Sequence, residues 1–231
     1  MECIVLAGGL GTRLRGVIGE QPKCMAPVND RPFLYYLLHY LQQQGCTKLI
    51  LSLGYKHEVV TEWLHGQSFD FKIDWVIEEE PLGTGGGIRL GLTAATEEEV
   101  FILNGDTFFD VSLQQMQAFH QQQKGAEATL ALKEMHHFER YGTVGLSGHS
   151  ITIFEEKKPK DQGLINGGVY LVNRAAFLNR PFPEKFSFEK DYLEAFVQEQ
   201  HFSGYISDGY FIDIGVPEDY NKVQSDFKIL F

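Results

Sequence analysis

The 231-residue chain has only three cysteines, and none has the spacing of a zinc or redox motif. Cys3, Cys24 and Cys46 are odd in number and form no Cys-x-x-Cys pair, so we expect reduced thiols in a cytosolic protein. Cys24 follows Lys23 and could be a reactive thiol, but the sequence supplies no base or partner for it. We therefore interpret Cys24 as a bystander.

Long apolar runs are also absent. No stretch approaches the roughly 18 apolar residues of a membrane-spanning helix, and the N-terminus lacks the basic and apolar regions of a signal peptide. We expect a soluble, cytoplasmic protein without a membrane partner. Basic residues are scarce, since 20 Lys and Arg accompany 31 Asp and Glu, for a formal net charge of −11. Such a field repels nucleic-acid phosphates, so we expect no nucleic-acid partner.

Several catalytic motifs are missing as well. The chain has no His-Glu-x-x-His or paired Cys/His spacing for zinc, no Gly-x-Ser-x-Gly elbow and no set of protein-kinase motifs. These absences exclude the metalloproteases, hydrolases and kinases that such motifs define.

The first informative stretch is the apolar run Ile4–Ala7, which ends in the glycine-rich loop 8–11. Glycines let successive backbone N–H groups converge on an anion such as phosphate. Arg13 and Lys23 follow closely and can reach the same polyphosphate. The loop is not the dinucleotide fingerprint, because Leu14 stands where that motif needs glycine, and it is not a Walker loop. On spacing alone, an ordinary glycine turn remains the alternative.

The first half of the chain alternates short apolar strands with helices. This βαβ pattern predicts an α/β fold with a Rossmann-like, mostly parallel central sheet flanked by helices. Ligands of such sheets bind outside the carboxyl ends of the strands. The expected strands are Ile4–Ala7, Lys48–Leu53, Lys72–Ile77 and Val100–Leu103, and the expected helices are Pro32–Gln44, Glu58–His65, Ile88–Leu92 and Leu113–Gln123.

Acidic residues stand at the ends of two predicted strands. Asp106 follows the strand Val100–Leu103, where a carboxylate is well placed to bind a magnesium ion that bridges phosphates. Asp213 ends a later strand and is the second expected ligand. Asp110 is interpreted as an N-cap or turn residue of the next helix.

From residue 127 the predicted strands become closely spaced. We expect them to form an antiparallel excursion over the ligand edge of the sheet, where it could bind a second substrate. The strand Leu164–Leu171 contains two glycines, which weaken a strand unless a ligand must approach closely, and a sugar ring is a plausible guest. The other predicted strands are Ala128–Lys133, Thr143–Leu146, Ile151–Glu155 and Phe202–Ile206, and helices are expected from Ser187, as N-cap, to Glu199 and at Pro217–Phe227.

Five motifs in the expected order resemble those of the sugar-1-phosphate nucleotidyltransferases, over nearly the whole chain. They are Leu6–Leu14 (LAGGLGTRL) with Pro22, Lys23 and Pro27; Glu79–Thr84 (EEPLGT); Tyr141-Gly142; Glu155–Pro159 (EEKKP); and Phe211–Pro217 (FIDIGVP). The resemblance implies a GT-A-like fold in one domain, 1–231. Residues 1–125 would mainly bind nucleotide, and residues 126–231 would mainly bind the sugar phosphate and complete the sheet. The left-handed β-helix that follows this domain in some relatives is not expected.

The resemblance also implies the site residues. Catalytic roles fall to Arg13, Lys23, Asp106 and Asp213, and the two aspartates would bind Mg²⁺. Nucleotide binding is assigned to Leu6, Ala7, Gly8, Gly9, Gly11, Thr12, Glu80, Pro81, Gly83, Thr84, Asn104 and Gly105. Sugar-phosphate binding is assigned to Tyr141, Gly142, Glu156, Lys157, Asn166 and Gly167. Two alternatives stay open: Lys158 could replace Lys157, because the doubled lysine departs from the family's Glu-Lys-Pro, and any of Glu78, Glu79 and Glu80 could contact the base.

Within the family, the motifs most resemble the short bacterial D-glycero-α-D-manno-heptose 1-phosphate guanylyltransferases, which make GDP-heptose for surface polysaccharide. The implied substrates are therefore GTP and this heptose 1-phosphate. Alternatives are uridylyl, thymidylyl or cytidylyl transfer, or guanylyl transfer to mannose 1-phosphate. A non-catalytic sugar-nucleotide sensor is an alternative of another class, although the predicted catalytic residues are all present. A homo-oligomer is possible.

Overall fold

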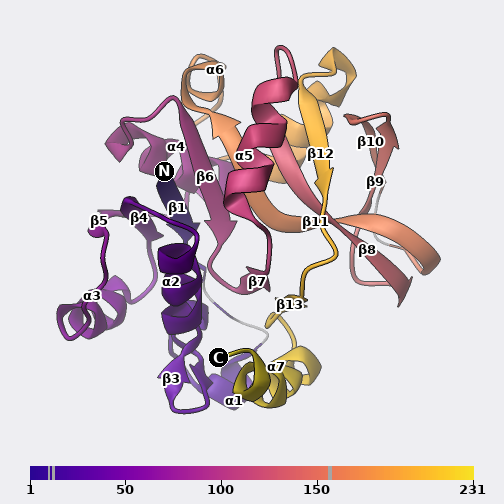
Figure 1. Ribbon diagram of the computed structural model, residues 1–231. Helices are drawn as coiled ribbons and strands as arrows, with labels where there is room; N and C mark the ends of the chain where they lie inside the picture. Colours follow the sequence, from indigo (N-terminus) through magenta and orange to yellow (C-terminus); the bar gives the residue numbers. More distant parts are fainter. Residues whose placement is uncertain (10, 12–13, 156–157) are drawn as a thin grey trace.

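The computed structural model describes residues 1–9, 11, 14–155 and 158–231 (Figure 1). Its centre is a nine-stranded sheet with the order β5-β4-β1-β6-β11-β8-β12-β10-β9. The strands of this sheet are β1 (Glu2–Leu6), β4 (Lys48–Leu53), β5 (Lys72–Ile77), β6 (Glu99–Asn104), β8 (Ala128–Phe138), β9 (Thr143–Ser147), β10 (Ser150–Glu155), β11 (Lys160–Asn173) and β12 (Phe202–Ile206). Two short ribbons pair β2 (Pro27–Val28) with β3 (Arg31–Pro32), and β7 (Thr107–Phe109) with β13 (Phe211–Asp213).

The sheet is mixed. Strands β5, β4, β1 and β6 are parallel, β11 enters antiparallel between β6 and β8, and β12 runs parallel to β8. Strands β10 and β9 form an antiparallel hairpin at the far edge. Within this sheet only β11 and β10 run against the other strands, so most strands share one direction although many neighbouring pairs are antiparallel.

Helices cover both faces of the sheet (Figure 1). They are α1 (Arg15–Ile18), α2 (Phe33–Gln43), α3 (His57–His65), α4 (Gly83–Ala94), α5 (Leu113–Gln122), α6 (Arg174–Leu178) and α7 (Pro217–Leu230). Strand side chains alternate between two buried cores, because successive residues of a strand point to opposite faces. Val5 packs in the core that contains α2, α5 and α7, whereas Ile4 packs in the core that contains α4 and α6. This two-sided burial confirms the predicted α/β class.

Helix α4 begins earlier than predicted. We expected a glycine-rich turn up to Gly87, but Gly83–Gly87 already form the first turns of the helix. The glycines are needed for packing: a Cβ on Gly85 would lie 2.3 Å from the ring of Phe186, and a Cβ on Gly86 would lie 2.8 Å from the carbonyl oxygen of Glu184. The low helix propensity of glycine is therefore overridden by close packing against the segment that follows α6.

Other boundaries also differ from the prediction. Ser112, not Asp110, caps α5, since its hydroxyl accepts a hydrogen bond from the backbone N–H of Gln115. Strand β8 pairs with β11 and β12 and does not form a hairpin with β9. Ser187 caps its helix as expected, but that segment is a π-helix, Phe188–Glu194, followed by a short 3₁₀ turn, Val197–Glu199. No helix among the described residues is long and apolar enough to cross a lipid bilayer.

Candidate active site

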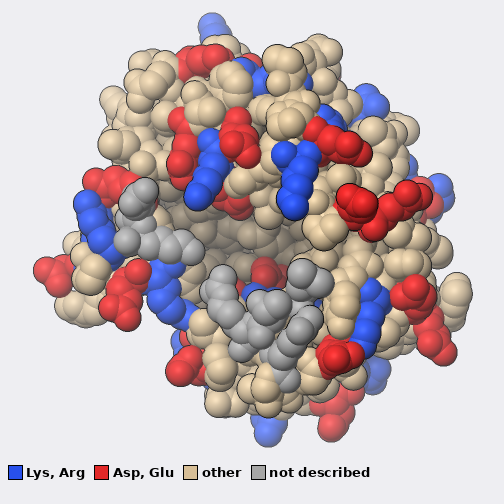
Figure 2. All heavy atoms as spheres, turned by 180° about the vertical axis from the view of Figure 1, so that it is seen from behind, with Lys and Arg blue, Asp and Glu red and all other residues tan. Residues whose placement is uncertain are grey.

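A cavity of about 910 Å³ opens where β1, β4 and β6 end. Figure 2 shows this hollowed face, with Lys and Arg side chains around the opening. The predicted residues that line it are Leu6, Ala7, Gly8, Gly9, Lys23, Pro81, Gly83, Thr84, Asn104, Gly105 and Asp106. Segments far apart in the sequence thus meet at the carboxyl edge of the parallel strands, as the topology predicts.

Three charged side chains meet at one end of the cavity. The ammonium of Lys23 lies 2.5 Å from Asp106 Oδ2 and 3.6 Å from Asp213 Oδ1. The Lys23 side chain is only 16% exposed, while the two aspartates are about one third exposed. One largely buried point charge is therefore shared by two partly exposed carboxylates, and of these three residues Lys23 and Asp106 line the cavity. We call this group the lysine cluster.

The lysine cluster is positioned by three separate elements. Lys23 begins the 3₁₀ turn Lys23–Met25, and Asp106 lies two residues after the end of β6. Asp213 ends β13, which pairs with β7 just after Asp106. The backbone N–H of Ile214 donates to the carbonyl oxygen of Asp106 at 3.0 Å, so the two aspartates are held together by their main chains.

The electrostatics of the lysine cluster favour a further positive charge. Burial and the nearby Asp106 carboxylate raise the pKa of Asp213, and the Lys23 ammonium only partly offsets this. Two carboxylates without a complete cage of protein ligands are typical of Mg²⁺, which is commonly bound by one or two carboxylates together with substrate phosphates. The residues present therefore fit a divalent cation held by Asp106 and Asp213.

The acidic stretch after β5 reaches the cavity through Glu78 and Glu79. Among the described lining residues Glu80 does not occur, and its side chain is exposed. Glu78 is fixed from both sides, because it accepts from the backbone N–H of Leu82 at 3.0 Å and from the hydroxyl of Ser52 at 3.3 Å. The structure thus places Glu78 and Glu79, rather than the predicted Glu80, against the cavity.

Sequence reasoning missed one wall of the cavity, formed by residues 54–58. Lys56 adopts a left-handed backbone conformation (φ 50°) at the start of α3, and its ammonium lies 3.0 Å from Glu20 Oε2. Strain of this kind in a non-glycine residue costs of order 1 kcal/mol and is commonly found near functional sites. The only hint in the sequence was the Gly54 turn at the carboxyl end of a predicted strand.

The predicted sugar-side residues lie around the first half of β11 and the turn before β9. The ring of Tyr141 packs edge-on against Phe211, two residues from Asp213, with ring centroids 5.8 Å apart. Burial raises the pKa of Tyr141 to about 12, so it stays a neutral hydrogen-bonding group. Asn166 donates to the hydroxyl of Tyr170 at 2.9 Å.

The glycines of this region have packing roles of their own. A Cβ on Gly167 would lie 2.3 Å from the ring of Phe109, and a Cβ on Gly142 would lie 2.7 Å from the carbonyl oxygen of Glu155. Gly11 has a positive φ of 57° and packs on the side chain of Lys23. Four predicted residues, Thr12, Arg13, Glu156 and Lys157, lie outside the described residues.

Cys24 lines the cavity but is not poised to react. Its thiol is buried, and burial together with the Asp106 carboxylate raises its pKa to about 12. Because the thiolate is the reactive form, the bystander interpretation is supported.

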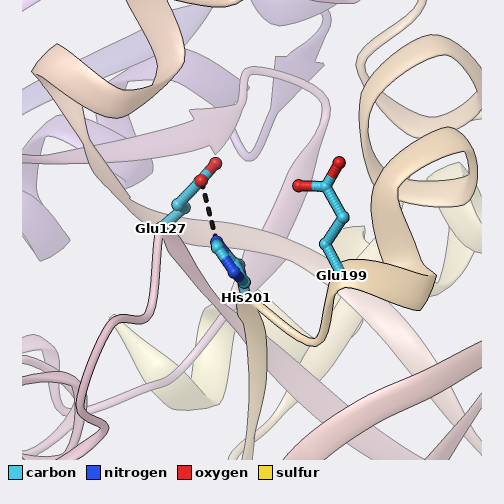
Figure 3. A group of neighbouring side chains, drawn as sticks. All are labelled: Glu127, Glu199 and His201. Atoms are coloured by element: carbon cyan, nitrogen blue, oxygen red, sulfur yellow. Dashed lines mark hydrogen bonds and ion pairs between the residues drawn. The ribbon is translucent and has the colours of Figure 1, made fainter.

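A second group of charged side chains lies at the opposite end of the parallel strands, where β8 and β12 begin. Glu127 and His201 immediately precede β8 and β12, and Figure 3 shows them with Glu199. The potential ligand atoms of these three residues lie within 4.8 Å of one another. Arg180, however, donates to Glu127 at 2.9 and 3.0 Å and to Glu199 at 2.7 Å. Arg180 thus already binds both carboxylates of this arginine cluster, so we interpret the cluster as a structural ion-pair network.

The sequence profile of the nucleotidyl transferase family matches residues 2–228. This chain belongs to that family. The resemblance inferred from the motifs is therefore confirmed, and the chain is a nucleotidyltransferase.

Two curated relatives in the nucleotidyl transferase family match almost the whole chain. The D-glycero-alpha-D-manno-heptose 1-phosphate guanylyltransferase of Aneurinibacillus thermoaerophilus is 49% identical over 228 residues, which cover 99% of each chain. The enzyme of the same name from Campylobacter jejuni is 46% identical over 221 residues, covering 95% of this chain and 97% of the relative. The crystal structure of HddC from Yersinia pseudotuberculosis complexed with GMP-PN superposes with a TM-score of 0.85 at 34% identity, covering 98% of this chain and 99% of that one.

Proposed function

We propose that the chain transfers GMP from GTP to D-glycero-α-D-manno-heptose 1-phosphate, forming GDP-heptose and pyrophosphate. The lysine cluster at the end of a large cavity carries the transfer chemistry, because it gathers a cation and two metal-binding carboxylates where β6 ends. The base and the sugar are supported by the two curated relatives, which match the chain from end to end. GDP-heptose would serve surface-polysaccharide synthesis, and the reaction would take place in the cytoplasm, where GTP is made.

Guanine recognition is assigned to the wall that contains Glu78 and Glu79. Guanine presents N–H donors along one edge, and a carboxylate accepts hydrogen bonds from them. Glu78 is rigidly held by Leu82 and Ser52, so its orientation is set before a ligand arrives. Backbone groups of the β1 loop and of residues 81–84 would complete the nucleotide site.

The phosphates would lie next to the lysine cluster. Lys23 and Arg13 would bind triphosphate oxygens, and Asp106 and Asp213 would hold Mg²⁺, which when bound neutralises phosphate charge during transfer. A phosphate oxygen of the sugar attacks the α-phosphorus of GTP in line, and the bond from the α-phosphorus to its bridging oxygen breaks to release pyrophosphate. This nucleophile is already ionised near pH 7, so the protein supplies positioning and charge neutralisation rather than a general base.

The sugar 1-phosphate would occupy the side of the cavity next to β11. Lys157 would hold its phosphate, while Glu156, Asn166 and the backbone of residues 142 and 167 would contact hydroxyl groups. Tyr141 packs on Phe211, two residues from Asp213, and the burial that keeps its hydroxyl neutral suits it to donate to a sugar or phosphate oxygen.

The direct test is pyrophosphate release in the presence of Mg²⁺. GTP, ATP, CTP, UTP and dTTP are each paired with D-glycero-α-D-manno-heptose 1-phosphate, mannose 1-phosphate and glucose 1-phosphate. Turnover with GTP and the heptose alone is the expected result. Turnover with another pair would overturn the substrate, and nucleotide-sugar binding without any turnover would replace the enzyme by a sensor.

A further inference from the structure

Three side chains from three strands meet where β10 ends and β11 begins. Glu155 ends β10, Lys160 begins β11 and Thr143 begins β9. The Thr143 hydroxyl donates to Glu155 Oε2 at 2.6 Å and accepts from Lys160 Nζ at 2.8 Å. The Lys160 ammonium also donates to the same Glu155 oxygen. We call this group the strand clamp.

The strand clamp is better shielded than an ordinary surface ion pair. Thr143 is 4% exposed, and the Lys160 side chain is 24% exposed. The Lys160 ammonium and the Thr143 hydroxyl lower the pKa of Glu155 to about 2, so the carboxylate is charged throughout the neutral range. Lys158 differs clearly, because it is 58% exposed and lies 3.9 Å from the other oxygen of Glu155.

The strand clamp joins both elements to which sugar-phosphate binding is assigned. Residues 156–159, which include Glu156 and Lys157, connect its two ends, Glu155 and Lys160. The backbone of Glu155 also packs directly on Gly142, where a Cβ would lie 2.7 Å from the Glu155 carbonyl oxygen. Any shift of Glu155 would therefore displace the turn at residues 141–142 and the start of the 156–159 connection together.

We propose that Lys160 is a positioning residue for the sugar 1-phosphate, which it aligns through Glu155 and Thr143 rather than by contact. The proposal rests on the proposed function of the 141–142 and 156–157 segments. Direct phosphate binding by Lys160 is disfavoured, because its ammonium is largely buried and already donates to two oxygen acceptors. Misplacement of a substrate-binding group by about 1 Å can lower the rate up to about 100-fold, so loss of the strand clamp can slow the reaction without removing any contact to the substrate.

Steady-state kinetics with GTP and the heptose 1-phosphate test this proposal. We expect Lys160→Met and Glu155→Gln each to raise KM for the sugar phosphate about 5- to 10-fold, and the double variant to be no worse than either single one, since coupled residues are non-additive. KM for GTP should change less than about twofold, because the nucleotide side of the cavity is untouched. Lys124→Met, which removes the charge of an exposed lysine in the turn after α5, is the control and should stay within about twofold of wild type.

Direct phosphate binding by Lys160 would give a different pattern of KM values. If Lys160 binds the phosphate itself, Lys160→Met raises KM whereas Glu155→Gln leaves it unchanged or lowers it, and this result would overturn the proposal. Additive effects in the double variant, or equal rises in the two KM values, would overturn it as well. Lys160→Arg keeps the positive charge and should recover part of the loss.

Amide hydrogen exchange tests the strand clamp without any substrate. Peptides covering residues 141–147 and 153–162 should exchange faster in Lys160→Met and Glu155→Gln than in wild type or Lys124→Met, with other peptides unchanged. Unchanged exchange would contradict the clamp. Failure of the wild-type protein to turn over the heptose 1-phosphate would instead contradict the proposed function while leaving this measurement intact.

Discussion

The lysine cluster and the arginine cluster each place two carboxylates around one strongly basic side chain, but they lie at opposite ends of the parallel strands. The arginine cluster also contains His201, whose Nδ1 lies 2.9 Å from Glu127 Oε1. Arg180 makes several directed hydrogen bonds to Glu127 and Glu199, and its guanidinium lies 4.0 Å from the ring centre of Phe196. Lys23 is a point charge that is shared unequally, at 2.5 and 3.6 Å, by Asp106 and Asp213 in an open cavity.

The difference shows how similar charges can either stabilise the fold or remain able to change partners when a ligand binds. A planar guanidinium fixes carboxylates bidentately and is expensive to replace, whereas an ammonium on a flexible stem can move to a new partner. The arginine cluster ties the segment after α6 to the starts of β8 and β12. The lysine cluster leaves two carboxylates that a divalent cation and phosphates can rearrange.

The largest predicted effect tests the lysine cluster. Asp106→Asn and Asp213→Asn should each lower kcat about 100- to 1,000-fold, because a carboxylate is lost where phosphate charge must be neutralised. The midpoint of urea unfolding should change little, since each aspartate side chain is about one third exposed. Unchanged rates in saturating Mg²⁺ would remove these residues from the metal site.

Substitutions in the arginine cluster should lower stability and leave turnover nearly unchanged. Glu127→Gln should lower the free energy of unfolding by about 2 kcal/mol, because it leaves a largely buried Arg180 with less compensation. Turnover at 25 °C should stay within about twofold of wild type. Glu199→Gln is the control: this carboxylate is 45% exposed, so its loss should cost less than about 1 kcal/mol. A strong loss of turnover without loss of stability would show that the two clusters are not separate in function.

A smaller effect sharpens the assignment of the positive charge proposed to hold the sugar phosphate. Lys157→Ala should raise KM for the sugar phosphate about 10-fold, as expected for a lost charge-assisted hydrogen bond, and Lys158→Ala should have a milder effect. The two variants are compared at fixed saturating GTP. The opposite ranking would move the phosphate-binding role to Lys158.

The smallest effect concerns a buried histidine near the arginine-cluster edge. His120 lies on α5 with its Nδ1 2.7 Å from the hydroxyl of Thr129, and burial lowers its pKa below the usual value of 6.5. The fold therefore favours neutral His120, and the stability that this preference supplies is present above about pH 6.5 and is lost as the pH falls below it.

Unfolding midpoints between pH 7.5 and 5 measure this contribution. Wild type should lose at most about 1.4 kcal/mol per pH unit through His120, and His120→Gln should flatten the curve by that amount. A curve of the same slope in both proteins would show that His120 does not titrate differently on folding.

Several strands of the sheet could be predicted from the sequence. Lys48–Leu53, Lys72–Ile77 and Phe202–Ile206 are strands with the predicted bounds, because short apolar runs between turn residues specify them locally. Asp106 and Asp213 could be placed at strand ends for the same reason. Their approach to one ammonium is a tertiary fact, because Asp213 ends β13, which pairs antiparallel with β7 outside the nine-stranded sheet.

What could not be predicted depends on contacts between distant segments. Three successive glycines indicate a turn, yet α4 starts there because Phe186 and the backbone after α6 occupy the space of their missing side chains. The cavity wall at residues 54–58 is formed only once β4 lies beside β1, and nothing local marks Lys56. Glu78, Glu79 and Glu80 were equivalent in the sequence, and only the structure separates those that face the cavity.

The most direct test of the whole account follows the phosphorus atoms of the reaction by ³¹P NMR. Wild type, Asp106→Asn and Glu127→Gln are each incubated with GTP, D-glycero-α-D-manno-heptose 1-phosphate and Mg²⁺. The account predicts one pyrophosphate for each GDP-heptose with wild type and Glu127→Gln, and almost no product with Asp106→Asn. Equal product formation by Asp106→Asn, or release of GDP and inorganic phosphate in place of a nucleotide sugar, would contradict it.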